Sequence, residues 1–332
     1  MKLLKYKNVL LVGGGAMGIA HIPRVFGLLG TESLAILETS AERGRFLRES
    51  YKRDPRVQVF DKLPSSGRYD LAVVCTPPKY HYPYFAELLD QVDAFIIEKP
   101  MTIASNDARK IVDESLKAGK PVFVNLLRRS LAGYKFLRRI YLEDIFGPLE
   151  SAEIHEGAVF SWQAVSRGSF SKELNGGGVL MDTGAHTLDL LLQVFDDLEV
   201  SEAYMDAEPE AIEANCVLKA TGDSRVPVVI NLSRNRQLSN QARFCFAGAS
   251  ISLGVSGNLL NVKDKRGLSY QLLPDGIRLE DEPPTYADLL DAFYVAHIAH
   301  GDNRGVGPSE SLKAVTQMER AYAMALPLEG VF

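Results

Sequence analysis

The sequence has little of the material from which disulfide frameworks, metal centres and membrane spans are built. Its 332 residues include only three cysteines, at Cys75, Cys216 and Cys245. They lie far apart and each falls inside an apparent strand, which favours buried reduced thiols over disulfides or metal ligands. No metal site is therefore expected. No apolar run reaches the roughly 18 residues that a membrane helix needs, and no internal repeat is evident.

Basic residues are not in surplus either. The chain has 37 lysines and arginines against 42 aspartates and glutamates, a formal net charge of -5. Without a basic run interleaved with aromatic residues, a nucleic-acid surface is not expected. The opening "MKLLKYKNVLLVGGG" places lysines before apolar residues, but this run is short and enters a glycine cluster without the cleavage pattern of a signal peptide. We expect a cytoplasmic protein that is not attached to a membrane.

The first part of the chain alternates apolar strands with helical segments. The strands "NVLLVG", "SLAILE", "YDLAVVCT" and "AFIIE" are nearly continuous in apolar residues. Strands of this kind, separated by helices, are typical of a parallel sheet covered on both faces. Residues 1–126 are thus predicted to form a Rossmann domain, a doubly wound parallel sheet of the α/β class.

Beyond residue 126 the pattern changes to alternation with a period of two. In "VPVVINLSR" the side chains of Val226, Val228, Ile230 and Leu232 share one face, which indicates a sheet with one buried side. Residues 127–332 are predicted to form an α+β domain with a mainly antiparallel open sheet, for substrate binding and oligomerisation. The segment "SESLKAVTQMERAYAMAL" is predicted to be a terminal packing helix.

A glycine-rich turn between the first strand and the first helix predicts a dinucleotide site. The turn fits G-x-G-x-x-G, and its candidate cofactor-binding residues are Gly13, Gly15, Ala16, Met17 and Gly18. Such glycines let a pyrophosphate approach the backbone N–H groups at a helix N-terminus. Glu38 ends the second strand, where a carboxylate binds the adenosine ribose diol and repels a 2'-phosphate. NAD is therefore favoured over NADP, although Arg43 and Arg45 nearby leave NADP open.

Two further segments lie where parallel strands end, at the edge where ligands of such sheets bind. The first contributes Thr76, Pro77, Pro78 and His81 to the candidate cofactor site, although a plain turn explains these residues about as well. The second is "EKP", in which Pro100 restricts the backbone of Lys99. A solvated strand-end lysine is the simpler reading from position alone.

The segment "NGGGVLMDTGAHTLDLLL" predicts an unusual helix. Asp182, His186 and Asp189 recur at i, i+4 and i+7 and would share one face of a mostly apolar helix. An aspartate four residues before a histidine suits a general base with its orienting carboxylate. It also suits a surface ion pair or half of a metal site.

Taken together, these motifs resemble the Gfo/Idh/MocA oxidoreductases, over nearly the whole chain. "VGGGAMG", "TPPKYH", "EKP", the pair Arg128 and Arg129, "GGGVLMDTGAHTLDLL" and "GPSESLKAV" occur in that family's order and at its usual separations. The resemblance implies that Lys99, Asp182 and His186 flank the nicotinamide and handle the substrate hydroxyl. It also implies that Glu98 contacts the nicotinamide ribose and that the Lys-Pro bond is cis.

The resemblance implies a fold and a function. Arg128 joins the cofactor-binding set, whereas Ser130 and Leu131 depart from the aromatic residue and aspartate common in the family. We expect an NAD(P)-dependent oxidoreductase that acts on a secondary hydroxyl or ketone of a sugar, a cyclitol or a sugar derivative. A non-catalytic cofactor-binding sensor and an NAD-assisted glycosidase of the same fold stay as alternatives.

The expected partners are a carbohydrate-like small molecule and further copies of the chain, in a homodimer or homotetramer. Candidate substrate residues, besides the three proposed catalytic ones, are His155, Trp162 and Arg167.

Overall fold

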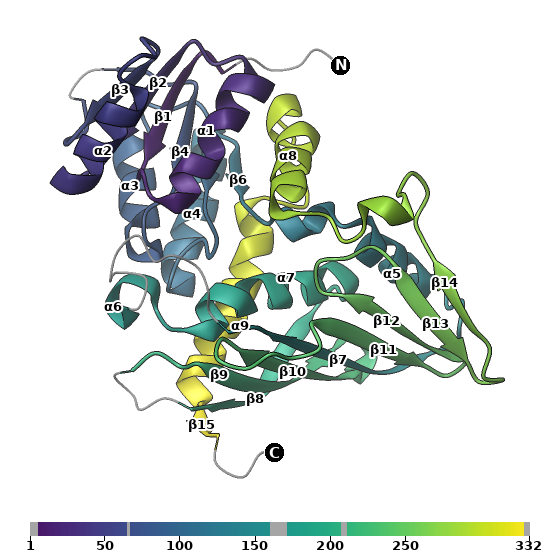
Figure 1. Ribbon diagram of the computed structural model, residues 1–332. Coiled ribbons are helices and arrows are strands. Elements are labelled where there is room, and N and C mark those ends of the chain that lie inside the picture. Colours follow the sequence, from purple (N-terminus) through teal and green to yellow (C-terminus); the bar gives the residue numbers. More distant parts are fainter. Residues whose placement is uncertain (1–5, 65–66, 160–170, 207–210, 329–332) are drawn as a thin grey trace.

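The computed structural model describes residues 6–64, 67–159, 171–206 and 211–328. Two separate sheets dominate the described chain, one of six strands and one of nine. Figure 1 shows the six-stranded sheet with its helices above the larger open sheet.

All strand pairs of the first sheet are parallel, in the order β3-β2-β1-β4-β5-β6. Its strands are β1 (Asn8–Val12), β2 (Ser33–Leu37), β3 (Val57–Phe60), β4 (Leu71–Val74), β5 (Phe95–Ile97) and β6 (Val122–Val124). β4, β5 and β6 are buried along their whole length, as expected for strands covered on both faces. The predicted Rossmann sheet is confirmed.

The helices of this part connect consecutive strands of the sheet. They are α1 (Ala16–Leu29), α2 (Ala41–Tyr51), α3 (His81–Leu88) and α4 (Ser105–Ala118), with a short 3₁₀ helix η1 (Pro78–Tyr80) before α3. α1 and α4 each end at a left-handed glycine, Gly30 and Gly119. Glycine adopts this conformation without a steric penalty, so the sequence itself ends both helices.

The second sheet is mixed but mostly antiparallel, in agreement with the mainly antiparallel sheet that the sequence predicted. Its order is β14-β13-β12-β11-β7-β10-β9-β8-β15, and only the pairs β7–β10 and β8–β15 are parallel. The strands are β7 (Leu149–Gly157), β8 (Leu198–Met205), β9 (Asn215–Gly222), β10 (Pro227–Ser233), β11 (Gln241–Phe246), β12 (Ala249–Gly254), β13 (Leu260–Asp264), β14 (Ser269–Leu272) and β15 (Leu326–Pro327). The predicted stripe through Val226, Val228, Ile230 and Leu232 is buried.

Helices lie on one face of this sheet (Figure 1). The α-helices and the π turn of this part of the chain are α5 (Ala132–Leu142), α6 (Lys172–Asn175), the π turn η4 (Leu180–Gly184), α7 (Ala185–Val194), α8 (Tyr286–Ala296) and α9 (Pro308–Met324). The 3₁₀ helices are η2 (Leu127–Ser130), η5 (Asp223–Arg225), η6 (Leu279–Asp281) and η7 (Ile298–His300). Sequence reasoning did not assign α5. None of the described helices is long and apolar enough to cross a membrane.

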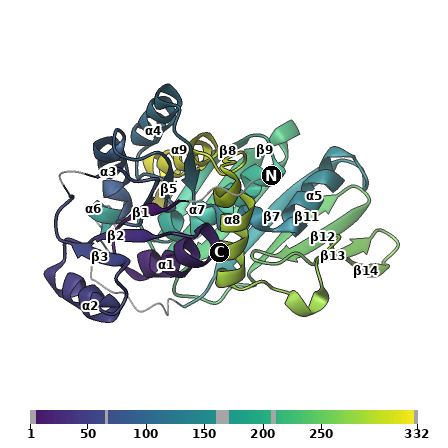
Figure 2. The ribbon, with the colours of Figure 1, turned by 90° about the horizontal axis from the view of Figure 1, so that it is seen from above.

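Elements late in the sequence return to the first sheet. Figure 2 shows α8 between α1 and the nine-stranded sheet, and α9 packs against α4. The backbone N–H of Val124 in β6 donates to Val306 O at 2.7 Å. The predicted terminal packing helix is confirmed, because Val315 and Met318 of α9 are buried.

One detail of the sequence reasoning was wrong. Cys216 lies in β9 and Cys245 in β11, but Cys75 follows the last residue of β4. Its thiol therefore lies at the edge where the parallel strands end, beside the candidate site.

Candidate active site

The glycine turn joins β1 to α1 through close backbone contacts. Gly13 has a φ of +95° and its N–H donates to Leu37 O at 2.9 Å. A methyl group on Gly18 would lie 2.1 Å from Gly13 O, so only glycine lets the helix approach the turn here. Gly15 differs, because a methyl group there would meet no atom within 4 Å. Its open side lies at the first turn of α1, where backbone N–H groups bind anions.

Glu38 lies against this turn. Its carboxylate accepts the N–H of Gly14 at 3.0 Å and the N–H of Ser40 at 2.8 Å. The guanidinium of Arg43 donates to Gly14 O at 2.7 Å, so a positive charge also reaches the turn. Glu38, which follows β2, and Arg43 of α2 therefore place a negative and a positive charge beside the predicted dinucleotide site.

Replacing Gly15 by alanine is expected to spare the fold and weaken NADH binding. The added methyl group meets open space in the protein but lies where a pyrophosphate would approach the helix N-terminus. We expect a loss of about tenfold or more in affinity, which corresponds to about 1.4 kcal/mol. Fluorescence titration with NADH measures it. Gly27→Ala, on the same helix with equally open space, is the control; equal affinity of the two variants would contradict the prediction.

The turn after β4 is fixed from inside by His81. The ring of His81 is fully buried and interacts with Thr76 O at 2.7 Å, Met101 O at 3.1 Å and Pro100 O at 3.2 Å. Burial, although opposed by these carbonyls, lowers the pKa of His81. His81 thus joins the two rim segments through their backbones, and its ring is taken up by these contacts.

Thr76 offers a polar group to a ligand. Its hydroxyl oxygen is buried and has no hydrogen-bond partner within the described part of the chain. A methyl group on Gly13 would lie 3.1 Å from the Thr76 backbone N, so this hydroxyl stands next to the glycine turn. An unpaired buried hydroxyl costs stability unless something bonds to it. Together with the open side of Gly15, it fits a dinucleotide cofactor.

Lys99 extends from the end of β5 to the second part of the chain. Its Nζ donates to Asp182 Oδ1 at 2.7 Å and to Asp182 O at 3.1 Å. The Lys99–Pro100 peptide bond is cis, as the family resemblance implied. Lys99 is therefore not a solvated strand-end lysine, because its ammonium links the two parts of the molecule.

Asp182 lies in the π turn that precedes α7. Attraction by the Lys99 ammonium, with smaller contributions from Arg234 and Arg128, lowers the pKa of Asp182 despite partial desolvation. The guanidinium of Arg234 lies 3.7 Å from the other carboxylate oxygen. Half of the Asp182 side chain remains exposed. The carboxylate is thus ionised, paired on both sides and open to a ligand.

The expected contact between the Asp182 carboxylate and the His186 imidazole is not found in the described part of the chain. Among the described residues no hydrogen bond joins them, and the carboxylate turns to Lys99 instead. The π turn from Leu180 to Gly184 accounts for the difference. It adds a residue to the helical turn, so side chains four apart no longer stack as they do in an α-helix.

His186 has a strongly depressed proton affinity. Burial, followed by the positive charges of Lys99 and Arg128, lowers the pKa of His186 well below its usual value. The imidazole is therefore neutral at neutral pH and can accept a proton. Lys99 thus lies close enough to His186 for its charge to act on the imidazole, and the shared catalytic role that the family resemblance implied for them stays a prediction.

His186 is expected to titrate well below pH 6.5, and to titrate at a higher pH in Lys99→Met, since one repelling charge is gone. Histidine ¹⁵N NMR measures both, with His186→Gln to assign the signal. In the unfolded chain the pKa of His186 is about 6.5, so near that pH the unfolded chain binds more protons at this site than the folded chain does. His186 should therefore reduce stability as the pH falls below about 6.5. An unchanged titration in Lys99→Met would contradict the assigned cause.

The adjacent arginines bind separate buried acids. Arg128 donates to both carboxylate oxygens of Glu156, at 2.9 and 2.5 Å, and Thr187 donates to the same carboxylate at 2.7 Å. Arg129 contacts both oxygens of Asp189, at 2.9 and 3.0 Å through Nε. Arg128 contributes positive charge beside His186, while Asp189 holds α7 against η2.

Glu213 anchors the helix that carries the site. Its carboxylate accepts the N–H groups of Gly178 and Leu180, both at 2.9 Å, and the hydroxyl of Tyr322 at 2.7 Å. A methyl group on Gly178 would lie 2.0 Å from Glu213 O, which explains that glycine. An acid at a helix N-terminus is stabilising, but this one comes 35 residues after Gly178 in the chain, so no local pattern predicts the contact.

Other residues of this site were also missed. They are Glu156, Arg234, His21, Asn125 and Tyr294, all of which contact a predicted site residue or its partner. Only Glu156 carried a readable signal, because it alternates with Ala152 and Ile154 toward the buried face of β7.

The structure does not place the three further candidate substrate residues beside Lys99 and His186. His155 points to the face of β7 opposite to Ile154 and Glu156, and its ring lies 3.6 Å from Glu153. Successive strand residues face opposite sides, so His155 lies on the face of β7 away from Glu156, and its role in substrate binding stays a prediction. Trp162 and Arg167 lie outside the described residues.

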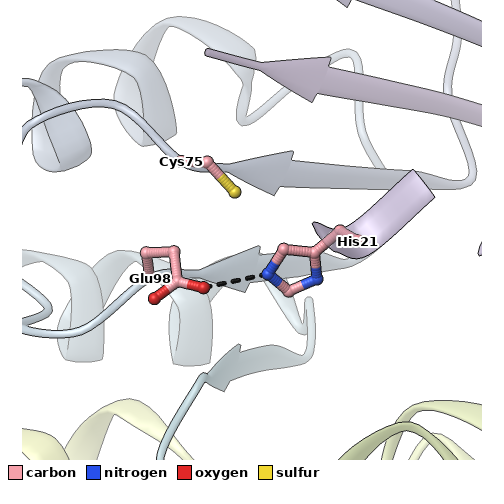
Figure 3. A group of neighbouring side chains, drawn as sticks. All are labelled: His21, Cys75 and Glu98. Carbon is pink, nitrogen blue, oxygen red and sulfur yellow. Dashed lines mark hydrogen bonds and ion pairs between the residues drawn. The ribbon is translucent and has the colours of Figure 1, made fainter. Parts of the chain in front are cut away.

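His21, Cys75 and Glu98 place their donor atoms within 4.8 Å of one another (Figure 3). However, His21 already bonds through both ring nitrogens, to Tyr294 and to Glu98. A metal ion would have to break one of these bonds, so the arrangement suits a hydrogen-bonded cluster better.

Comparison with known proteins agrees with this geometry. Residues 7–126 match the family model described as "Oxidoreductase family, NAD-binding Rossmann fold", and residues 134–253 match that of the "GFO/IDH/MocA C-terminal domain". The described part of the chain thus combines the NAD-binding Rossmann domain of an oxidoreductase family with the C-terminal domain of the same family. The chain belongs to the Gfo/Idh/MocA family.

Two curated relatives match over part of their length. D-glucoside 3-dehydrogenase of Escherichia coli (strain K12) is 25% identical over 171 residues, which are 49% of this chain and 46% of that protein. Inositol 2-dehydrogenase of Corynebacterium glutamicum (strain R) is 30% identical over 141 residues, 41% of each. The matched part is therefore less than half of each relative.

The fold is also that of solved structures. KijD10, a 3-ketoreductase from Actinomadura kijaniata in complex with NADP and TDP-benzene, superposes with a TM-score of 0.79. It is 15% identical, and the match covers 97% of this chain and 98% of that one.

Proposed function

We propose that this chain is an NAD-dependent dehydrogenase that acts on a secondary hydroxyl, or the matching ketone, of a sugar, a cyclitol or a sugar derivative. The bond of 2.7 Å between Lys99 and Asp182 carries the proposal. It joins the edge of the first sheet, where the glycine turn lies, to the π turn and helix that carry Asp182 and His186. The proposed cofactor-binding residues and the proposed catalytic residues therefore lie next to each other. The names of the curated relatives support the substrate class.

The cofactor would be held by the glycine turn, Glu38, Thr76 and the rim prolines. When bound, its nicotinamide supplies the acceptor or donor of the hydride. Glu38 would pair with a ribose diol and repel a 2'-phosphate, which favours NAD. Arg43, which reaches the same turn, would weaken that preference.

The protein's own groups would move the proton. His186, kept neutral, takes the hydroxyl proton at its free nitrogen during oxidation. The Lys99 ammonium donates a hydrogen bond to the substrate oxygen as that oxygen gains negative charge. Asp182 holds the Lys99 ammonium in place and balances its charge. It thus acts on Lys99, and not on His186 as the sequence suggested.

The experiment is a screen of the purified protein against sugars, inositols and nucleotide sugars with NAD and with NADP, followed by NADH or NADPH absorbance. Net formation of NADH with one of these substrates is the expected result. Cofactor binding without turnover would favour the sensor, and glycoside cleavage without net NADH would favour the glycosidase. A preference for NADP would contradict the role of Glu38.

The open sheet suggests where copies of the chain would meet. Its outward side chains include charged pairs such as Lys219–Glu202 at 2.8 Å and Arg243–Glu153 at 3.7 Å, together with the exposed apolar side chain of Val229. We expect a homodimer or homotetramer built on this face, with an association that weakens as salt screens the charges. Light scattering at micromolar concentration and at two salt concentrations measures it, and a monomer at low salt would contradict it.

A further inference from the structure

A buried polar cluster lies directly behind Lys99. His21 from α1 contacts Glu98 Oε1 at 2.9 Å through Nε2 and the Tyr294 hydroxyl at 2.7 Å through Nδ1. Asn125 donates to the same Glu98 oxygen at 2.7 Å. His21 and Glu98 face each other beside Cys75 in Figure 3. All four members of the cluster are at least nine-tenths buried.

The direction of the hydrogen bond between His21 and Glu98 follows from the charge of Glu98. Burial opposes ionisation, but the bonds from His21 and Asn125 and the charge of Lys99 lower the pKa of Glu98. An ionised carboxylate only accepts, so Nε2 of His21 carries the proton. The Nδ1 of His21 and the Tyr294 hydroxyl share the second bond of this histidine, at 2.7 Å. That hydroxyl stays protonated, because burial raises the pKa of Tyr294 well above its usual value.

The cluster reaches Lys99 through the backbone. The second oxygen of Glu98 accepts the N–H of Lys99 at 3.2 Å. Helix α1 thus contacts the carboxylate that precedes Lys99 through His21, and α8, from a distant part of the sequence, contacts that histidine through Tyr294. Neither His21 nor Tyr294 contacts Lys99 itself.

We propose that His21 and Tyr294 are positioning residues: they hold the Glu98 carboxylate in one orientation, and through it they fix Lys99 against Asp182. The inference rests on the proposed function. Without His21, Glu98 loses a donor in a buried place and can rotate or take up a proton. Lys99 then loses the acceptor of its backbone N–H, and its ammonium moves relative to the substrate oxygen.

Four variants test the proposal. His21→Leu removes both bonds, and His21→Gln keeps a donor that can reach Glu98. Tyr294→Phe keeps the buried ring and removes only the hydroxyl. Tyr6→Phe is the control, since the buried Tyr6 hydroxyl donates to Ile298 O at 3.4 Å, away from Lys99.

Turnover and NADH affinity are measured separately, with the substrate found in the screen. Displacing a catalytic group by about 1 Å can lower the rate by about 10²-fold, which is the loss in kcat expected for His21→Leu. His21→Gln should recover most of it, and Tyr294→Phe should fall between His21→Leu and the parent. Tyr6→Phe should match the parent. Equal kcat losses in His21→Leu and His21→Gln would mean a role in folding only and would overturn the proposal.

A second measurement does not depend on turnover. Histidine ¹⁵N NMR of the parent protein without cofactor should show a proton on Nε2 of His21, and the Nδ1 signal should shift in Tyr294→Phe. The Nδ1–H tautomer in the parent would overturn the proposal, even if His21→Leu does not fold.

The two proposals fail in different ways. If Lys99→Met loses turnover and His21→Leu does not, the positioning role fails alone. If the parent turns over no substrate in the screen, the proposed function fails, and the positioning role falls with it whatever the tautomer.

Discussion

Replacing Lys99 by methionine should leave folding and NADH binding intact and lower turnover by about 10²-fold to 10⁴-fold, the usual contribution of a positioned acid–base group. Methionine fills most of the space of the lysine stem but has no donor for Asp182 or for a substrate oxygen. Folding should survive, because Asp182 keeps Arg234 at 3.7 Å and is half exposed. Steady-state kinetics with NADH titration separates the two effects.

The control is Lys110→Met, which removes an exposed lysine paired with Asp107 at 2.8 Å on α4. Exposed pairs of this kind contribute about 0–1 kcal/mol, so neither stability nor turnover should change much. His186→Ala should give a defect comparable to Lys99→Met, and the double variant should lose less than the product of the two. Near-normal turnover of Lys99→Met would remove Lys99 from the proposed mechanism.

Asp189→Ala is expected to destabilise the protein by about 3–5 kcal/mol, because it strands a buried guanidinium. Arg129 is 12% exposed and Asp189 2%, and they meet at 2.8 Å. Burial raises the pKa of Asp189 even against the attraction of Arg129, so ionising this acid here is unfavourable. Removing one partner of the pair should thus destabilise the fold strongly, whereas replacing both partners by apolar residues should change the free energy of unfolding little.

A double variant tests that distinction. Arg129→Met with Asp189→Leu removes both charges and fills similar volume, so it should recover most of the stability lost in Asp189→Ala. Urea unfolding followed by circular dichroism measures all three proteins. Asp196→Ala is the control, since its pair with Arg138 is largely exposed on the Asp196 side. A double variant as unstable as Asp189→Ala would show that the pair itself stabilises the fold.

The sequence predicted the parts of the site that local backbone geometry determines. Gly13 and Gly18 are required where the turn and helix touch, and Glu38 ends a strand, so the dinucleotide site could be read from spacing alone. Lys99 could be placed at the strand end but not given a partner. That partner, Asp182, lies 83 residues away and is reached only through tertiary packing.

What the sequence could not predict depends on packing between segments or on one irregular turn. The π turn at Leu180–Gly184 looks like an ordinary helix in the sequence, so Asp182 was matched with His186. His155 was expected in the segment after a strand, whereas it lies within β7, where register decides which face its side chain takes. Glu213 and Tyr294 are recognised only when their distant partners are seen.

The contacts of β6 and α4 with the end of the described chain affect how the protein emerges from a ribosome. The side chain of Asn303 donates to Val122 O at 3.1 Å across 181 residues, and α9 covers α4. Synthesis at about 5–20 residues per second leaves β6 and the buried side of α4 without these partners for about ten seconds or more. Throughout that interval the face of α4 on which α9 later packs is open to solvent, although the strands of the first sheet have already been synthesised.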